Sequence, residues 1–170
     1  MQIHTIAGKT ARALWLPILM ALFLSACGFH LRGDIALPSL YERVHVVDKG
    51  YSDVGRSLSN ALINSGSKMV SSPEEASSVI TILSRGIERR ALNVGGKQVR
   101  EYELQLTILF VVQDHSGKQL SEPQRVSIVR NFQNNTNAVL GRDNEEQIIR
   151  REMMQPAIIQ LLRRLKAIAN

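Results

Sequence analysis

Polar and apolar residues alternate most regularly between residues 101 and 113 of this 170-residue chain. The apolar residues occupy every second position: Tyr102, Leu104, Leu106, Ile108, Phe110 and Val112. Glutamate, glutamine and threonine fill the positions between them in the first half of the segment. A period of two predicts a β-strand with one buried face and one face that is at least partly polar.

Three other segments rich in β-branched residues predict strands at residues 43–47, 79–92 and 125–133. Residues 68–71 form either a brief strand or an extended link. Gly95-Gly96 predicts a hairpin turn, so the strands on either side of it are expected to pair antiparallel.

Apolar residues at helical spacing predict a helix that begins near Ser52 or Asp53, either of which can cap it. The run Asn64-Ser65-Gly66 predicts where this helix ends, because glycine is favoured just beyond a helix.

A longer helix is predicted after Asp143, which can cap it, and Glu146 three residues later resembles a capping box. The apolar face of this helix repeats at helical spacing: Ile149, Met153, Ala157, Ile158, Leu161, Leu162, Leu165 and Ile168. Pro156 lies inside the pattern, and we expect a kink there because proline removes one backbone hydrogen bond.

The order strand, helix, three strands, helix predicts an α+β fold, with two helices packed on one face of a four-stranded, mostly antiparallel sheet. The other face of the sheet is then left uncovered by this chain. Ile80, Leu83, Leu109 and Val111 do not all fit one side of one sheet. Either some apolar surface is exposed and available for binding, or a bulged strand hides it.

The N-terminal segment has the layout of a secretory signal, in which the basic residues Lys9 and Arg12 precede an apolar stretch at residues 13–24. This stretch of twelve residues is too short to span a membrane. Leu24-Ser25-Ala26-Cys27 resembles the lipobox of bacterial lipoproteins, in which the chain is cut before the cysteine and acyl chains are attached to it. Gly28 then favours the outer membrane. The alternative is a plain secretory signal that contains a cysteine.

We therefore expect a lipoprotein signal peptide at residues 1–26, an acylated N-terminus and tether at 27–40, and one α+β domain at 41–170. Removing the signal leaves 19 basic and 15 acidic residues, and 14 of the basic residues are arginines. Export argues against nucleic acid as a partner. A polyanionic lipid or an acidic protein surface fits this charge, and so does ordinary solvated surface charge.

The sequence offers no recognisable catalytic or metal site, and it suggests no cofactor. The histidines His4, His30, His45 and His115 form no HExxH pair, and no nucleophile turn or phosphate-binding glycine loop is present. Arg142 precedes the last helix, where backbone amides favour anions, although Asp143 competes for those amides.

Two segments resemble the LptE family of LPS-assembly lipoproteins. Cys27-Gly28-Phe29-His30-Leu31-Arg32-Gly33 is similar to the start of the mature family proteins. Leu140-Gly141-Arg142-Asp143-Asn144-Glu145-Glu146 is similar to the family's entry into its last helix, and Glu101-Tyr102 to a strand start.

The resemblance implies a non-enzymatic outer-membrane lipoprotein, acylated at Cys27 and facing the periplasm. It also implies binding of lipopolysaccharide and a plug and assembly role in the β-barrel translocon LptD. A family basic residue that contacts lipopolysaccharide falls at Arg142. A second falls near the hairpin at residues 94–97, where glycine replaces it and Lys97 or Arg100 can substitute.

Three other functions stay open at this point. The chain could be a general outer-membrane lipoprotein that scaffolds another envelope complex. It could also be an envelope enzyme with an unrecognised site, or a nucleic-acid-binding domain suggested by its charge alone.

Overall fold

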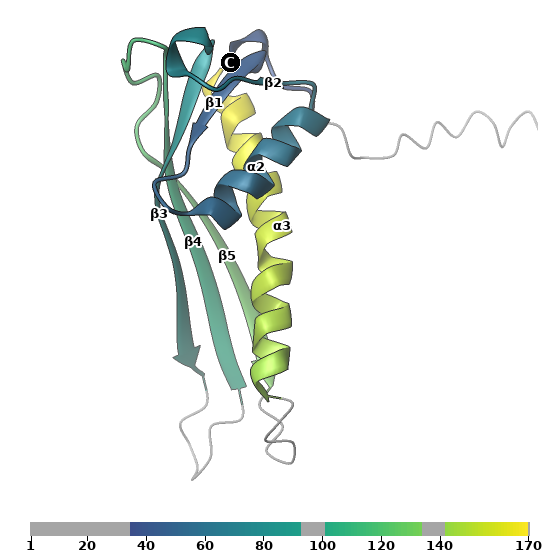
Figure 1. Ribbon diagram of the computed structural model, residues 1–170. Helices are drawn as coiled ribbons and strands as arrows, with labels where there is room; N and C mark the ends of the chain where they lie inside the picture. Colours follow the sequence, from purple (N-terminus) through teal and green to yellow (C-terminus); the bar gives the residue numbers. More distant parts are fainter. Residues whose placement is uncertain (1–34, 93–100, 134–141, 170) are drawn as a thin grey trace, which may run out of the picture. The chain divides into compact units, whose positions relative to one another are not determined.

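The structure, a computed structural model, describes residues 35–92, 101–133 and 142–169 (Figure 1). The elements follow in this order: η1 (Ser39–Tyr41), β1 (Arg43–Val47), α2 (Ser52–Asn64), β2 (Lys68–Met69), η2 (Pro73–Glu75), β3 (Ser78–Ala91), β4 (Glu101–Gln113), β5 (Gln124–Gln133) and α3 (Arg142–Ile168). The predicted α+β class with two helices is confirmed.

The strands form one mixed sheet in the order β2-β1-β3-β4-β5. The long pairings β3–β4 and β4–β5 are antiparallel, as predicted, whereas β1 pairs in parallel with both β2 and β3. The predicted strand count of four is wrong by one, because Lys68 and Met69 pair with Arg43 and Val44. Two residues are too few to show a period, so the sequence left this segment as either a strand or a link.

Both helices lie on the same face of the sheet (Figure 1). α3 packs on β4 and β5, and α2 packs on α3 and on β1, β2 and β3. Every second residue of β4 from Leu104 to Val112 is buried beneath the helices, as the alternation predicts. The predicted apolar face of α3 is confirmed, since its central residues are buried: Met153, Ala157, Ile158, Leu161, Leu162 and Leu165.

The start of α2 differs from the prediction. Its N-cap position is Tyr51, and no side chain caps it. Asp53 lies in the first turn, where its carboxylate accepts a hydrogen bond from the Val54 amide at 2.9 Å and pairs with Arg85 of β3 at 3.3 Å. The predicted end is confirmed, because α2 ends at Asn64 and Gly66 has a φ of +91°.

α3 begins at Arg142, ahead of the predicted cap, and continues for 27 residues through Pro156. The Glu146 carboxylate, predicted as part of a capping box, instead binds Arg89 of β3 and Arg150 of its own helix. A partner on a strand that is distant in sequence is invisible to a local sequence pattern.

A register shift between Ile82 and Ser84 places a bulge at Leu83. Ile80 is fully buried beneath the helices. Val111 points to the opposite face of the sheet, and it is also buried, with 3% of its surface exposed. The bulge that one alternative predicts is therefore present in β3, and Leu83 beside it is only partly buried. Leu109 stays partly exposed on the face that the helices leave open.

Candidate functional site

Four residues were predicted to carry function. Cys27, Lys97 and Arg100 lie outside the described residues. The backbone of Arg142 begins α3, and its side chain lies outside what the structure describes.

The elements that flank these cations meet at one end of the fold, which we call the loop end. Antiparallel pairing puts the end of β3 beside the start of β4, with Ala91 opposite Tyr102. The start of β4 also lies beside the end of β5, with Glu101 opposite Gln133, and α3 starts at this same end (Figure 1).

An arginine–glutamate cluster lies near the loop end and joins β3 to α3. Arg89 Nη1 donates to Glu146 Oε2 at 3.1 Å, and Arg150 Nε donates to Glu146 Oε1 at 2.9 Å. The Arg89 guanidinium also lies 4.8 Å from the ring centre of Tyr102, which stacks on Phe132 with 5.5 Å between ring centres. The cluster therefore ties all three long strands to the first turns of the helix.

The electrostatics of this cluster favour a charged carboxylate and an excess of positive charge. Partial burial raises the pKa of Glu146, but the hydrogen bonds from Arg150 and Arg89 outweigh it and hold the pKa below its ordinary value. Two arginines share the one carboxylate, and their side chains are 52% and 41% exposed. Guanidinium groups with accessible donors can accept a further anionic partner such as a phosphate or carboxylate.

Sequence reasoning missed this cluster. The strand at residues 79–92 was predicted, but the bulge at Leu83 reverses which residues of its second half face the helices. After the bulge, Arg85 pairs with Ile108 and Arg89 with Leu104, so both arginines point to the helix side of the sheet. No signal in the sequence marked the bulge beyond the apolar residues that did not fit one face.

The open face of the sheet, opposite the helices, is largely polar. Its members alternate with the core residues: Ser84, Glu88 and Arg90 of β3, Glu103, Gln105, Thr107 and Leu109 of β4, and Ser127, Val129 and Asn131 of β5. Some of these side chains pair with one another across the strands. Gln105 Nε2 donates a hydrogen bond to Ser127 Oγ at 2.9 Å, and Arg90 Nη1 forms an ion pair with Glu103 Oε1 at 3.9 Å. Val129, 48% exposed, is the most exposed apolar side chain on this face, so the face is polar with a small apolar centre rather than a large apolar patch.

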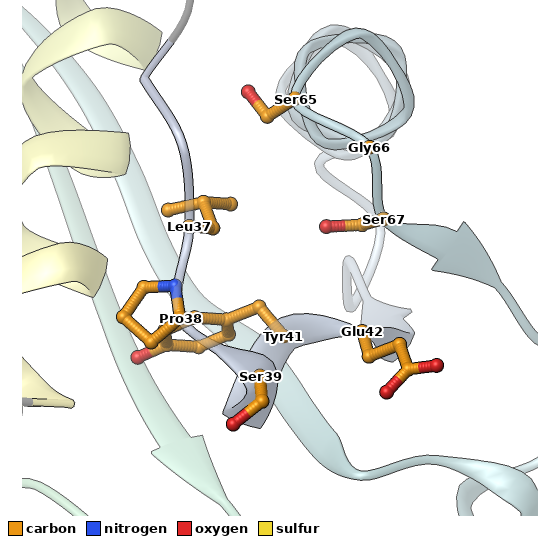
Figure 2. Close-up of a pocket in the computed structure, with 8 residues that line it drawn as sticks. All are labelled: Leu37, Pro38, Ser39, Tyr41, Glu42, Ser65, Gly66 and Ser67. Atoms are coloured by element: carbon orange, nitrogen blue, oxygen red, sulfur yellow. The ribbon is translucent and has the colours of Figure 1, made fainter.

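A pocket lies at the opposite end of the fold, where the chain enters the domain (Figure 2). Its volume is about 170 Å³, and its walls come from two segments: Leu37, Pro38, Ser39, Tyr41 and Glu42 on one side, and Ser65, Gly66 and Ser67 on the other. Ser67 is buried and its hydroxyl has no hydrogen-bond partner among the described residues, and Figure 2 shows it directed toward Leu37. Ligand pockets usually measure about 300–1,000 Å³, so this one fits a few water molecules better than a lipid headgroup.

Among the described residues, no three histidine, cysteine, aspartate or glutamate side chains gather in a way that could hold a metal ion. No helix within the described ranges has the length and apolar character needed to cross a membrane.

Comparison with known proteins gives a consistent picture over almost the whole domain. The family model "LptE: Lipopolysaccharide-assembly" matches residues 41–165. An LPS-assembly lipoprotein LptE from Pectobacterium atrosepticum is 31% identical over 155 residues, which cover 88% of this chain and 82% of that protein. The protein of the same name from Photorhabdus laumondii is 25% identical over 156 residues, covering 89% and 84%.

A solved structure has the same architecture. The solution NMR structure of lipoprotein B from Nitrosomonas europaea superimposes with a TM-score of 0.71 at 26% identity. The match covers 84% of this chain and 92% of that one.

Proposed function

Because the chain belongs to the LptE lipopolysaccharide-assembly family, we propose that it is an outer-membrane lipoprotein that binds lipopolysaccharide and acts as plug and assembly partner of an LptD-type β-barrel. The match of the family model to residues 41–165 carries this proposal, because it spans the domain from η1 almost to the end of α3. The chain is not an enzyme, since its family and its curated relatives are assembly proteins.

The first part of the proposal is the lipid anchor at Cys27, on the periplasmic side of the outer membrane. Its support is the signal layout and the lipobox-like residues 24–27, together with relatives that are named as lipoproteins. A single acyl chain holds only marginally, and a lipoprotein with several chains stays attached. Mass spectrometry of native material tests this part, because an intact leader or a free Cys27 thiol would contradict it.

The second part is an anion site at the loop end, in which Arg142, Lys97 and Arg100 contact the phosphates and carboxylates of lipopolysaccharide. Its support is topological: the connection that contains Lys97 and Arg100 joins β3 to β4, and Arg142 starts α3, at the same end of the fold. The described arginines Arg89 and Arg150, which bind Glu146 near the loop end, add positive charge there. Arginine binds phosphate through two parallel hydrogen bonds, which suits such a ligand.

Lipopolysaccharide binding by the charge-reversal pair Arg142→Asp and Lys97→Asp tests the anion site. We expect a large loss of affinity that is reduced at high salt, since screening weakens exposed ionic contacts. The matched control is Lys68→Asp with Lys118→Asp, which changes the charge equally on exposed residues outside the loop end. Equal affinity of the test pair and the unchanged protein would remove the site.

The barrel partnership is tested by purifying the acylated full chain in mild detergent. We expect one large β-barrel protein to be recovered in equal amounts. Stoichiometric recovery of a different envelope complex would instead support the scaffold alternative, and recovery of the chain alone would contradict both.

A further inference from the structure

The chain enters the domain beside the C-terminal end of α3, and we call this the tether end. Ile35, Leu37 and Leu40 pack against the core there. Tyr41 of η1 donates its hydroxyl to the Leu165 carbonyl at 2.9 Å. The tether end is therefore held to the last turns of α3 by a buried contact and cannot swing freely away from them.

The short tether limits how far this end can be from the anchored residue. Seven residues, 28–34, separate Cys27 from Ile35. Even fully extended, the eight steps from Cys27 to Ile35 span about 28 Å. If Cys27 is acylated, the tether end can lie no further than about 28 Å from the anchored residue at the membrane surface.

The last turns of α3 carry positive charge without negative charge. No acidic residue follows Glu152 in the chain. Arg163 and Lys166 are exposed, and neither forms an ion pair with an acidic side chain in the described part of the domain. Arg164 differs, because it turns toward β5 and donates to Gln124 at 3.3 Å.

We infer that the tether end faces the membrane and that Arg163 and Lys166 contact the headgroups of anionic phospholipids. This inference rests on the acylation of Cys27 that is part of the proposed function. Anionic phospholipid is the expected partner because its charge is complementary to these cations and because only a short length of chain separates the anchor from the fold. Each cation close to an anionic membrane surface strengthens the contact about fivefold, so the pair shifts the balance between contacting and free states by about 25-fold.

Cations in the last turn of a helix also interact favourably with the helix dipole. That effect does not depend on lipid composition, whereas headgroup contact does. The experiment must therefore vary the lipid as well as the protein.

The acylated full chain is placed in vesicles of phosphatidylcholine, with or without about a third of phosphatidylglycerol. A fluorophore on Ala167→Cys, an exposed position beside Lys166, reports contact through quenching by a headgroup-attached quencher. A second reporter, on Ala91→Cys at the loop end, is the matched control. We expect strong quenching at residue 167 only in the vesicles that include phosphatidylglycerol. Quenching at residue 91 should be weak in both types of vesicle.

The double variant Arg163→Gln and Lys166→Gln should reduce quenching at residue 167 to the level seen in phosphatidylcholine, as should 1 M salt. Quenching that is equal in the two types of vesicle, or that is unchanged in the double variant, overturns the inference. The interaction with the helix dipole is then the role of these cations. Quenching that stays weak in both lipids also overturns it, and leaves the charge available for an acidic protein surface. Failure of acylation is distinguished from these results, because the chain then does not float with either type of vesicle.

Discussion

The hydroxyl of Tyr41 provides a sensitive test of how the tether end is held. Tyr41 is 1% exposed, and α3 ends three residues after Leu165, whose carbonyl accepts the Tyr41 hydrogen bond. The last four carbonyls of a helix have no partner within the helix. Tyr41→Phe keeps the ring in the core but leaves this buried carbonyl unpaired.

Leaving a buried carbonyl unsatisfied costs about 1–3 kcal/mol. For a domain of this size, a loss of 1 kcal/mol lowers the melting temperature by about 4 °C, so we expect a decrease of about 4–12 °C. Thermal and urea unfolding of the full chain in detergent, followed by circular dichroism, measure it. Tyr51→Phe is the matched control, because the Tyr51 hydroxyl forms no hydrogen bond within the described residues and Tyr51 is only partly buried.

The same variant predicts a pH dependence with a definite sign. Burial raises the pKa of Tyr41 to about 12 from its ordinary value of 10.0. The folded state therefore favours the neutral phenol, and this contribution is complete below pH 10 and is lost as the pH rises toward 12. The stability difference between the unchanged protein and Tyr41→Phe should be constant from neutral pH to about pH 9 and shrink above pH 10. A difference no larger than that of Tyr51→Phe, or one that widens above pH 10, would refute the reasoning.

Three further predictions concern stability, each measured by urea unfolding. Glu146→Gln should lower the free energy of unfolding by about 0.5–1.5 kcal/mol at neutral pH, because the arginines that bind Glu146 are partly exposed. Its effect should be complete above pH 4.5 and decrease as the pH falls from there through the lowered pKa of the folded carboxyl, and an effect that grows with falling pH would contradict this. Leu161→Ala, at a fully buried position, should cost about 2–5 kcal/mol, and a cost below 1 kcal/mol would mean that the helix is not packed as described. Gly55→Ala should destabilise despite the better helix propensity of alanine, because the new Cβ would lie 2.7 Å from the Asp48 Cβ. Gly86→Ala should be tolerated, because a Cβ added there has no atom within 4 Å. If Gly86→Ala lost more stability than Gly55→Ala, the close approach at Gly55 would be contradicted.

Local periodicity was sufficient for most of the fold. The alternation in β4 and the apolar stripe of α3 predicted which side chains are buried, because each depends only on the geometry of its own element. The end of α2 was also predictable, since Gly66 adopts a positive φ that other residues disfavour.

Features that depend on partners distant in sequence were not predictable in this way. Asp53 was a candidate cap, but it pairs with Arg85, and Glu146 was assigned to a capping box, but it binds Arg89. Both arginines reach the helices only because the bulge at Leu83 turns them to that side. For the candidate site, the sequence identified Cys27 and Arg142 through motifs, and their roles stay predictions.

The length of α3 connects the two ends of the domain to the proposed function. A helix of 27 residues is about 40 Å long, which is close to the 40–45 Å thickness of a bilayer with its headgroups. With the tether end at the periplasmic surface, a domain that stands upright inside a barrel brings its loop end close to the opposite leaflet. A plug that delivers lipopolysaccharide outward needs its anion-binding residues at that far end, and the candidates Arg142, Lys97 and Arg100 belong to the elements and connection that meet there. Cations then serve both ends but meet different lipids: the headgroups of membrane phospholipids at one end, and the phosphates and carboxylates of an arriving lipid at the other. A domain lying flat against the membrane would put both ends at the same depth, so quenching of the Ala91→Cys reporter in the barrel complex by periplasmic-leaflet headgroups would contradict this orientation.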